Sequence, residues 1–272
     1  MPRVSVIVPT FKHGKFIAQT LDGIVQQKTN FDVEILIGDD ASTDDTSLII
    51  RDFQQKFPNK IKAFLHPKNL GPLEPKMLGG KNNVTFLFQR ATSEYIALCE
   101  GDDYWTNPHK LQKQVDFLDA NPEYALTHHQ LEIIYEDGSA AQLFNAENQP
   151  ETSELKDLLA DESWFLGTAS TVFRNTIKGE FPDWWLKTAS GDLGIFILTT
   201  QYGKIRYFPE IMGVYRKHSG GMTNIHTPQN VDFLTNRMEM FGELQEYFNP
   251  KFSEILTKTI KKYQKIISNL HV

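Results

Sequence analysis

Four short apolar runs within the first hundred residues constrain the fold of this chain more than any other feature. They lie at residues 4–8, within the stretch FDVEILIGDD, at 61–65 and at 95–99, and Pro9 is expected to end the first. Short apolar runs of this kind are typical of strands buried on both faces. Segments with apolar residues at helical spacing follow, as at 16–25. This alternation predicts an α/β fold with a mostly parallel, twisted central sheet flanked by helices.

Local patterns predict the remaining elements. Ser42 is expected to begin a helix through a capping box, because Asp45 occupies the third position after it. Glycine and proline residues predict a loop over 67–83, and Ser153 is expected to cap a short helix that ends at Leu159. Further strands are predicted over 125–138, 167–174 and 204–216, helices near 111 and 193 and from 228 onward, and a loop over 139–151.

Composition narrows the class of protein. The formal net charge of −6 argues against a general affinity for nucleic acid, and we expect no nucleic-acid partner. Cys99 is the single cysteine, so no intramolecular disulfide can form, and a reducing compartment is indicated. The first residues, MPRVSVIVPTF, do not resemble a signal peptide. No stretch approaches the length of about 18 uncharged apolar residues that spans a membrane. We therefore expect a cytoplasmic protein.

Polar clusters follow three of the predicted strands. Thr10 and Phe11 come after the first, Asp39 and Asp40 end the second, and the stretch EGDD at 100–103 follows the fourth. In parallel sheets, ligands bind outside the carboxyl ends of the strands, so these clusters predict one site. Carboxylates there can bind Mg²⁺ or Mn²⁺ together with phosphates, and can accept hydrogen bonds from a nucleotide base or ribose. Either acidic pair alone is explained equally well by helix capping or a solvated turn.

Two common nucleotide-binding motifs are absent from the sequence. No G-x-G-x-x-G follows the first predicted strand, and no G-x-x-x-x-G-K-[ST] occurs anywhere. Binding of a dinucleotide in the Rossmann manner, or of a nucleotide on a P-loop, therefore loses its main support. A nucleoside diphosphate neutralised by a metal ion remains.

The segments VSVIVPTF, EILIGDDASTDDT, NLG, SEYIALCEGDDYW and KLQKQVDFL, in this order, resemble the inverting family-2 glycosyltransferases with the GT-A fold. The resemblance is strong over residues 3–120 and weaker to about 224. It implies a nucleoside-diphosphate sugar donor, usually a UDP-sugar, with Mn²⁺ or Mg²⁺ as cofactor. The implied acceptor is a saccharide or lipid-linked saccharide in bacterial surface-polysaccharide assembly. It also divides the chain into a nucleotide-sugar-binding half at 1–105, an acceptor-binding and catalytic half at 106–225, and a helical extension at 226–272.

The resemblance assigns donor and metal roles to individual positions. Asp39 would accept a hydrogen bond from the base, in a pocket lined by Pro9, Thr10 and Phe11. Asp102 would contact the ribose or the metal, and Asp103 would bind the metal. The late segment YRKHSGGMT adds His218 as a ligand of the metal or a phosphate, and Arg216 or Lys217 to offset the charge of the leaving group.

The chain departs from the family pattern at two places. Glu100 stands where the family often has Asp, so a direct metal role for Glu100 is not carried over. An Ala-Arg-Asn run that often follows NLG is missing, and PLEPKMLGGKNN stands in its place. The residues of that segment that could substitute are Lys76, Lys81 and Asn83.

The resemblance places the acceptor site in the second half. Asp192, in TASGDLGIFIL, is expected to be the general base, because an inverting transfer needs a group that deprotonates the attacking hydroxyl. The alternative for Asp192 is a helix N-cap. Trp164, Gly167 and Thr168 are predicted to lie near the acceptor sugar, whereas Trp184 and Trp185 suit either a sugar or the core.

The C-terminal residues carry an apolar stripe with lysines on the other positions. This pattern fits a helix packed on the domain, or a helix at a membrane surface near a lipid-linked acceptor. Two other functions fit parts of the sequence. A sugar nucleotidyltransferase also needs a nucleotide-binding sheet and Mg²⁺, but PTFKHGK is a poor version of its glycine-rich loop. A non-catalytic nucleotide- or carbohydrate-binding protein is the other alternative.

Overall fold

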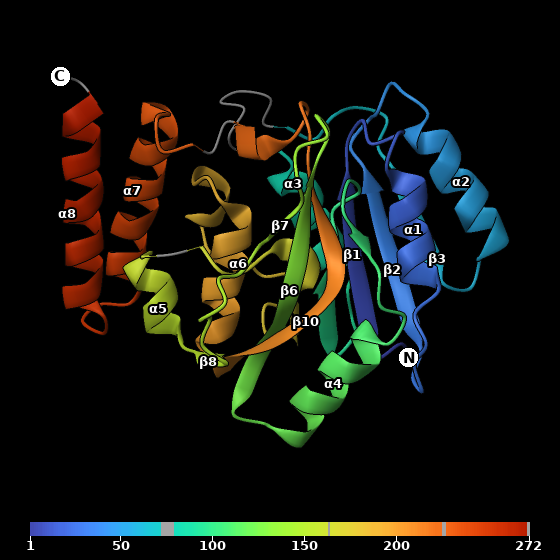
Figure 1. Cartoon of the computed structure of the whole chain (residues 1–272), viewed down its shortest axis with the longest axis horizontal. Coiled ribbons are helices and arrows are strands. Elements are labelled where there is room, and N and C mark those ends of the chain that lie inside the picture. The colour runs from blue at the N-terminus through green and yellow to red at the C-terminus, as the bar shows by residue number, and fades with distance from the viewer. Residues whose placement is uncertain (72–78, 163, 225–226, 271–272) are drawn as a thin grey trace.

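A computed structural model describes residues 1–71, 79–162, 164–224 and 227–270 (Figure 1). One ten-stranded sheet forms the centre, with eight strands in the order β3-β2-β1-β4-β9-β6-β10-β5. The first four of these pair in parallel: β3 (Ile61–Leu65), β2 (Val33–Asp39), β1 (Val4–Thr10) and β4 (Tyr95–Leu98). The others are β9 (Val172–Arg174), β6 (Tyr124–Tyr135), β10 (Lys204–Lys217) and β5 (Tyr104–Trp105), with β7 (Gln142–Leu143) on β6 and β8 (Thr152–Ser153) on β10.

The sheet changes from parallel to mixed in its second half. β9 pairs antiparallel with both β4 and β6, and β5 pairs antiparallel with β10, whereas β6 and β10 are parallel. The predicted α/β class with a flanked central sheet is therefore confirmed, and its parallel part is the region β3-β2-β1-β4 together with the pair β6-β10. Because the sheet runs through both proposed halves, the division at residue 105 stays a prediction.

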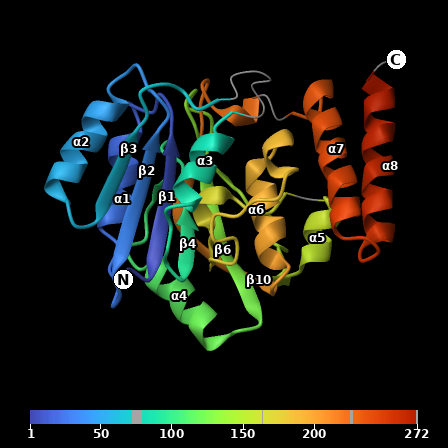
Figure 2. The same cartoon turned by 180° about the vertical axis from the view of Figure 1, so that it is seen from behind.

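Helices cover both faces of the sheet, as Figures 1 and 2 show from opposite sides. Alternate residues of β1 point to opposite faces, since Val4, Val6 and Val8 belong to one apolar cluster and Ile7 to the other. The first face carries α1 (Ile17–Val25), α2 (Thr46–Lys56) and α4 (Lys110–Ala120). The second carries α3 (Lys81–Phe88), α5 (Leu155–Ala160), α6 (Gly191–Thr200), α7 (Val231–Tyr247) and α8 (Ser253–Leu270).

The predicted first strand is confirmed, but Pro9 does not end it. β1 continues through Pro9 to Thr10. The ladder with β4 stops at the pair Ile7 and Leu98, and the carbonyl of Pro9 accepts a hydrogen bond from the N–H of Gly101 beyond it.

Three helix starts differ from the predictions. α2 begins at Thr46 rather than near Ser42, because the Ser42 hydroxyl donates to Asp39 and the N–H of Thr46 donates to Asp44. α5 has a capping box between Glu154 and Asp157, since Ser153 already belongs to β8. α3 lies in part of the predicted loop. The predicted helix after residue 228 is two helices, α7 and α8, which lie side by side at one end of the molecule (Figures 1 and 2).

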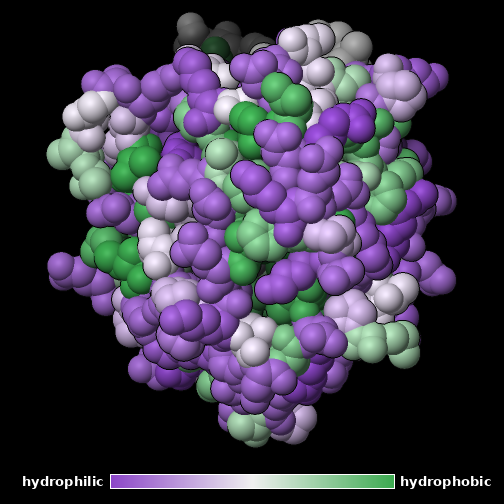
Figure 3. All heavy atoms as spheres, turned by 90° about the vertical axis from the view of Figure 1, so that its right-hand side faces the viewer, coloured by the Kyte–Doolittle hydropathy of each residue, from purple (hydrophilic) through white to green (hydrophobic). Residues whose placement is uncertain are grey.

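Two predicted strands are shorter than expected. Residues 168–170 form a short 3₁₀ helix, so β9 begins only at Val172, and β6 ends at Tyr135 before the turn at Gly138. No helix in the described ranges combines the length and apolar character needed to cross a membrane. Figure 3 shows the side of the molecule that carries α2, where hydrophilic side chains predominate and apolar ones are scattered.

Candidate active site

The polar clusters that follow β1, β2 and β4 meet at one edge of the sheet, here called the carboxyl edge. Thr10 pairs in register with Asp39, and the N–H of Asp40 donates to the carbonyl of Thr10 at 3.0 Å. The N–H of Gly101 donates to the carbonyl of Pro9 at 3.1 Å. The predicted convergence of these three clusters is therefore confirmed.

Gly101 allows the loop after β4 to approach β1 closely. A Cβ atom at this position would lie 2.7 Å from Cβ of Thr10 and 2.8 Å from Nδ1 of His13. The hydroxyl of Thr20 in α1 donates to the carbonyls of Gly101 and Asp103, at 3.0 and 2.6 Å. Helix α1 thus holds the loop, and the glycine lets Asp102 lie against the residues that follow β1.

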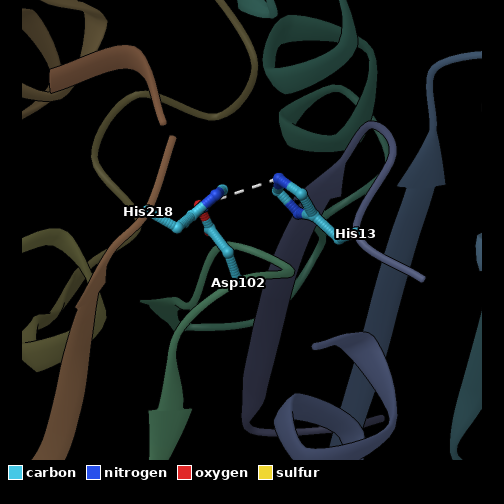
Figure 4. A group of neighbouring side chains, drawn as sticks. All are labelled: His13, Asp102 and His218. Carbon is cyan, nitrogen blue, oxygen red and sulfur yellow. Dashed lines mark hydrogen bonds and ion pairs between the residues drawn. The ribbon is translucent and has the colours of Figure 1, made fainter. Parts of the chain in front are cut away.

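His13, Asp102 and His218 form a group of neighbouring side chains from three separate segments (Figure 4). Nε2 of His218, which follows β10, lies 3.0 Å from Oδ2 of Asp102, and Nε2 of His13, which follows β1, lies 3.6 Å from the same oxygen. The three possible ligand atoms lie within 4.8 Å of one another. One carboxylate and two imidazoles at this separation can hold a divalent metal ion.

The charges of this group are coupled. Burial raises the pKa of Asp102, but the imidazoles of His13 and His218 outweigh it and hold that pKa below its usual range. Burial lowers the pKa of His13, against the effect of the Asp102 carboxylate. Both shifts favour an ionised carboxylate beside a neutral imidazole, which are the protonation states that bind metal.

Asp103 does not belong to this group and contacts Arg216 instead. Its buried carboxylate accepts a hydrogen bond from the N–H of Arg216 at 2.9 Å, and burial together with the nearby Asp102 and Glu100 raises its pKa. The guanidinium of Arg216 donates to the carbonyl of Asp102 and to Gln19, and lies 4.4 Å from the centre of the Tyr104 ring. The structure thus brings the predicted residues Asp102, Arg216 and His218 together, and Asp103 contacts the backbone of Arg216.

Buried polar atoms without partners gather at this place. Within the described ranges, Oγ1 of Thr10, Nδ1 of His13 and Oε2 of Glu100 have no hydrogen-bond partner. Burial and the neighbouring carboxylate of Asp102 raise the pKa of Glu100 to about 8. Unpaired buried polar groups are costly, so three of them beside one carboxylate indicate a site completed by a ligand or an ion. The residues present therefore fit a divalent cation.

The predicted base-binding residues lie beside this group. Phe11 is 40% exposed, and the ammonium of Lys12 lies 5.1 Å from the centre of its ring. Asp39 is fully buried, and its carboxylate accepts three hydrogen bonds, from the N–H of Ser42 at 3.2 Å and from the hydroxyls of Ser42 and Ser47. A carboxylate has about four acceptor positions, so Asp39 retains capacity for one further N–H.

Helix α3 contains two of the three residues that could substitute for the missing Ala-Arg-Asn run, Lys81 and Asn83. Asn83 donates to the carbonyl of Gly38 at 2.8 Å, and so ties α3 to the end of β2. Lys81 instead points toward the second half of the chain, where its buried ammonium donates to the carbonyls of Trp185 and Thr188. Lys76, the remaining candidate, lies outside the described residues.

Asp192 lies in the first turn of α6 rather than at its N-cap, which is Ser190. Its Oδ1 accepts from the N–H of Leu193 at 2.8 Å. Burial lowers the pKa of Lys81 to about 7, and the carboxylate of Asp192 raises it. The carboxylate of Asp192 also raises the pKa of Glu100, by less than burial and the carboxylate of Asp102 do. Its charge therefore acts on both the carboxyl edge and α3.

The predicted acceptor residues separate into two groups. Trp164 is 39% exposed, and the guanidinium carbon of Arg237 lies 5.4 Å from the centre of its ring. Thr168 is half-buried and hydrogen-bonds to Glu100, whereas Gly167 is buried against Leu131. The two alternative aromatic residues, Trp184 and Trp185, are buried in the core.

Sequence reasoning missed His13 and Arg237. A single histidine three residues beyond a strand carries no signal until the fold places it against Gly101. Arg237 lies in a segment for which only a helical pattern was apparent.

Comparisons with known proteins agree with this geometry. Residues 5–177 match the family model described as Glycosyl transferase family 2. An uncharacterized protein of Mycobacterium tuberculosis is 35% identical over 222 residues, which cover 80% of this chain and 60% of the relative. The chain thus spans about 60% of the length of this curated relative.

Two solved structures share the fold. TarS of S. aureus in complex with UDP-GlcNAc aligns with a TM-score of 0.65 at 19% identity, covering 98% of this chain and 71% of that one. The mannosyltransferase PcManGT of Pyrobaculum calidifontis, in complex with GDP-Man and Mn²⁺, gives 0.65 at 17% identity, covering 99% and 73%.

The mixed sheet, with acidic and histidine residues at its carboxyl edge, has the GT-A fold that these structures share. The chain belongs to glycosyltransferase family 2.

Proposed function

We propose that this chain is a metal-dependent inverting glycosyltransferase that uses a nucleoside-diphosphate sugar, in the first place a UDP-sugar. The observation that carries the proposal is the group of His13, Asp102 and His218 at the carboxyl edge of a family-2 fold. The bound UDP-GlcNAc of TarS and the GDP-Man and Mn²⁺ of PcManGT support this class of donor and cofactor.

In this proposal the donor nucleotide binds at the ends of β1 and β2. Phe11 stacks on the base, Asp39 accepts a hydrogen bond from it, and Pro9 and Thr10 line the pocket. The exposed ring of Phe11 and the spare acceptor capacity of Asp39 support these roles.

His13, Asp102 and His218 are the residues that would hold the metal ion. A bound ion would neutralise charge on the diphosphate of the leaving group. Mg²⁺ prefers oxygen ligands, whereas this group supplies two imidazoles, and the PcManGT structure contains Mn²⁺, so we propose Mn²⁺ rather than Mg²⁺. Asp103 would act through Arg216, by fixing its backbone beside the leaving group. This differs from the metal role that the sequence predicts for Asp103.

The protein's own chemistry in the transfer step is proton removal. The acceptor oxygen forms a bond to the anomeric carbon while the bond from that carbon to the diphosphate breaks. The leaving diphosphate keeps the electron pair, and the acceptor proton passes to the carboxylate of Asp192. A positioned base of this kind contributes about 10² to 10⁴ in rate. Trp164, Gly167 and Thr168 would form the acceptor side, with Trp164 against a sugar ring.

We propose a saccharide or lipid-linked saccharide acceptor in surface-polysaccharide assembly. TarS is named a poly(ribitol-phosphate) β-N-acetylglucosaminyltransferase, which supports a surface polymer as acceptor. The apolar stripe of α8 packs on the core through Leu256 and Tyr263, in line with a packed helix. Lys261 and Lys265 of α8 are exposed. We propose that such lysines make peripheral contact with the cytoplasmic face of the membrane.

The test is a donor screen. Purified protein is incubated with UDP-GlcNAc, UDP-glucose or GDP-mannose and Mn²⁺, and release of the nucleoside diphosphate is measured. We expect release from at least one donor, loss of release with EDTA and recovery on adding Mn²⁺. Release that is unaffected by EDTA would contradict the metal requirement. If none of the three donors binds and none is cleaved, the proposed activity is contradicted.

A further inference from the structure

Two consecutive side chains of α7 contact the segment that leads into α6. The amide of Asn236 accepts a hydrogen bond from the N–H of Ala189 and donates to the carbonyl of Lys187 at 3.1 Å. Both ends of one amide thus bind the backbone of residues 187–189. This segment leads directly to Asp192.

Arg237, the next residue, binds two side chains at once. Its Nη1 donates to the hydroxyl of Ser190 at 2.8 Å, and its Nη2 donates to Oδ1 of Asp161 at 2.9 Å. The side chains of the Arg237–Asp161 ion pair are each 10% exposed. Tyr263 of α8 donates to the other oxygen of Asp161, so the charge of this carboxylate is fully paired. Helices α7 and α8 both contribute to this network.

The two partners of Arg237 have an unusual backbone conformation. Ser190 has a φ of 59° and Asp161 a φ of 47°, in the left-handed region that non-glycine residues rarely adopt. Such conformations cost free energy and persist where surrounding contacts enforce them. A single guanidinium binds both residues. Ser190 is the N-cap of α6, two positions before Asp192.

The same guanidinium lies on the acceptor side of the site. Its central carbon is 5.4 Å from the centre of the ring of Trp164, which is 39% exposed. Burial lowers the pKa of Arg237, but Asp161 and Tyr263 raise it above its usual range. The carboxylate of Asp192 makes a smaller contribution in the same direction. Arg237 therefore lies between the proposed base and the proposed sugar platform.

We propose that Asn236 and Arg237 are positioning residues, which fix the start of α6, and with it Asp192, relative to Trp164. This inference rests on the proposed function of Asp192 as the base. The helical extension is then part of the acceptor site. A buried ion pair is weak evidence for stability, since apolar residues of similar volume often stabilise a fold as well. The planar guanidinium of Arg237 instead fixes the relative positions of two separate segments, because its two Nη atoms bind Ser190 and Asp161 at once.

The test uses Arg237→Lys, which keeps the charge but loses the fork, and Asn236→Ala in case the first variant fails to fold. Gln245→Ala is the matched control, since Gln245 lies on the same helix but bonds to Thr257 of α8. The readouts are UDP release from UDP-GlcNAc with Mn²⁺ and water as acceptor, affinity for UDP with Mn²⁺, melting temperature, and amide hydrogen exchange over residues 189–194.

We expect both test variants to release UDP about tenfold to a hundredfold more slowly, the scale on which misplaced catalytic groups lose rate. Their affinity for UDP should stay within about twofold, and the amides at 189–194 should exchange faster, with neither change in the control. Slower release with native exchange at 189–194, or native release with faster exchange, would overturn the proposal. If the native protein cleaves none of the donors, the proposed function fails. Hydrogen exchange alone then tests whether Asn236 and Arg237 fix the start of α6. Native protection of residues 189–194 in both variants would refute that role.

Discussion

Nε2 of His218 lies 3.0 Å from Oδ2 of Asp102, although 116 positions separate the two residues in the sequence. The histidine directly follows β10, and the aspartate lies in the loop after β4. His13 approaches the same oxygen from the loop after β1. Three segments far apart in the chain thus supply one candidate metal site, and its predicted properties can be tested separately.

Replacing His13 with Asn should weaken metal binding without abolishing turnover. The variant loses one of three possible ligands while Asp102 and His218 remain. We expect the Mn²⁺ concentration for half-maximal UDP release to rise about tenfold to a hundredfold, as for other changes around metal sites. His109→Asn, at an exposed position before α4, should leave it unchanged. An unaltered Mn²⁺ dependence in His13→Asn would exclude His13 as a ligand.

The Asp103→Asn variant distinguishes the metal role predicted for Asp103 from the proposed role through Arg216. The amide oxygen of Asn can still accept the hydrogen bond from the N–H of Arg216. We therefore expect less than about a tenfold loss of UDP release, and no change in the Mn²⁺ dependence. A loss of about a hundredfold or more, typical of removing a preorganised electrostatic contact, would instead support Asp103 as a metal ligand.

Asp192→Asn should separate catalysis from binding. Asp192 is not the cap of α6, so the substitution changes its charge and basicity and leaves the helix start in place. Sugar transfer should fall by about 10² to 10⁴, the usual contribution of a general base, while UDP affinity and melting temperature stay near native values. Transfer at the native rate would exclude Asp192 as the base. Loss of UDP binding would move Asp192 into the donor pocket.

The stability of the protein should depend on pH through Lys110. Its ammonium is fully buried 4.1 Å from the centre of the Trp105 ring, without a hydrogen-bond partner in the described ranges. Burial lowers its pKa from 10.5 to about 7. Between these values the unfolded chain binds the additional proton, so the free energy of unfolding rises with pH from about 7 toward 10.5.

The Lys110→Met variant should lose the contribution of Lys110 and keep that of Lys81, whose pKa burial also lowers to about 7. Relative to it, the native protein should gain up to about 1.4 kcal/mol per pH unit across the alkaline range in urea unfolding. Lys113→Met, which changes an exposed lysine of the same helix, should keep the native slope. Equal slopes in the native protein and Lys110→Met would show that Lys110 titrates normally.

Much of the donor side could be predicted from the sequence because its signals are local. The strands β1 to β4 are short apolar runs with polar residues at their ends, and a parallel sheet brings those ends together. Asp102 and His218 each lie in a recognisable segment. Helix α3 was missed because KNNVTFLF mixes β-branched and aromatic residues without a clear helical period. Its packing against β1 and β2 stabilises it instead.

The acceptor side depends on contacts that local sequence does not encode. Ser190 and Asp161 adopt left-handed conformations, and Arg237 binds both, across 47 and 76 positions. Similarly, the capping serine expected at residue 42 binds Asp39 instead, and α2 starts later. In each case a tertiary hydrogen bond outweighs a local preference.

The central claim is that Asp102, between two histidines, holds the metal that the donor diphosphate requires. The most direct measurement is electron paramagnetic resonance of Mn²⁺ titrated into the native protein and into Asp102→Asn, each with saturating UDP. We predict that the native protein depletes the signal of free Mn²⁺ and that the bound Mn²⁺ shows nitrogen couplings from imidazole. The variant should bind Mn²⁺ at least about a hundredfold more weakly. Equal Mn²⁺ binding by both proteins, or bound Mn²⁺ without nitrogen coupling, would contradict the claim.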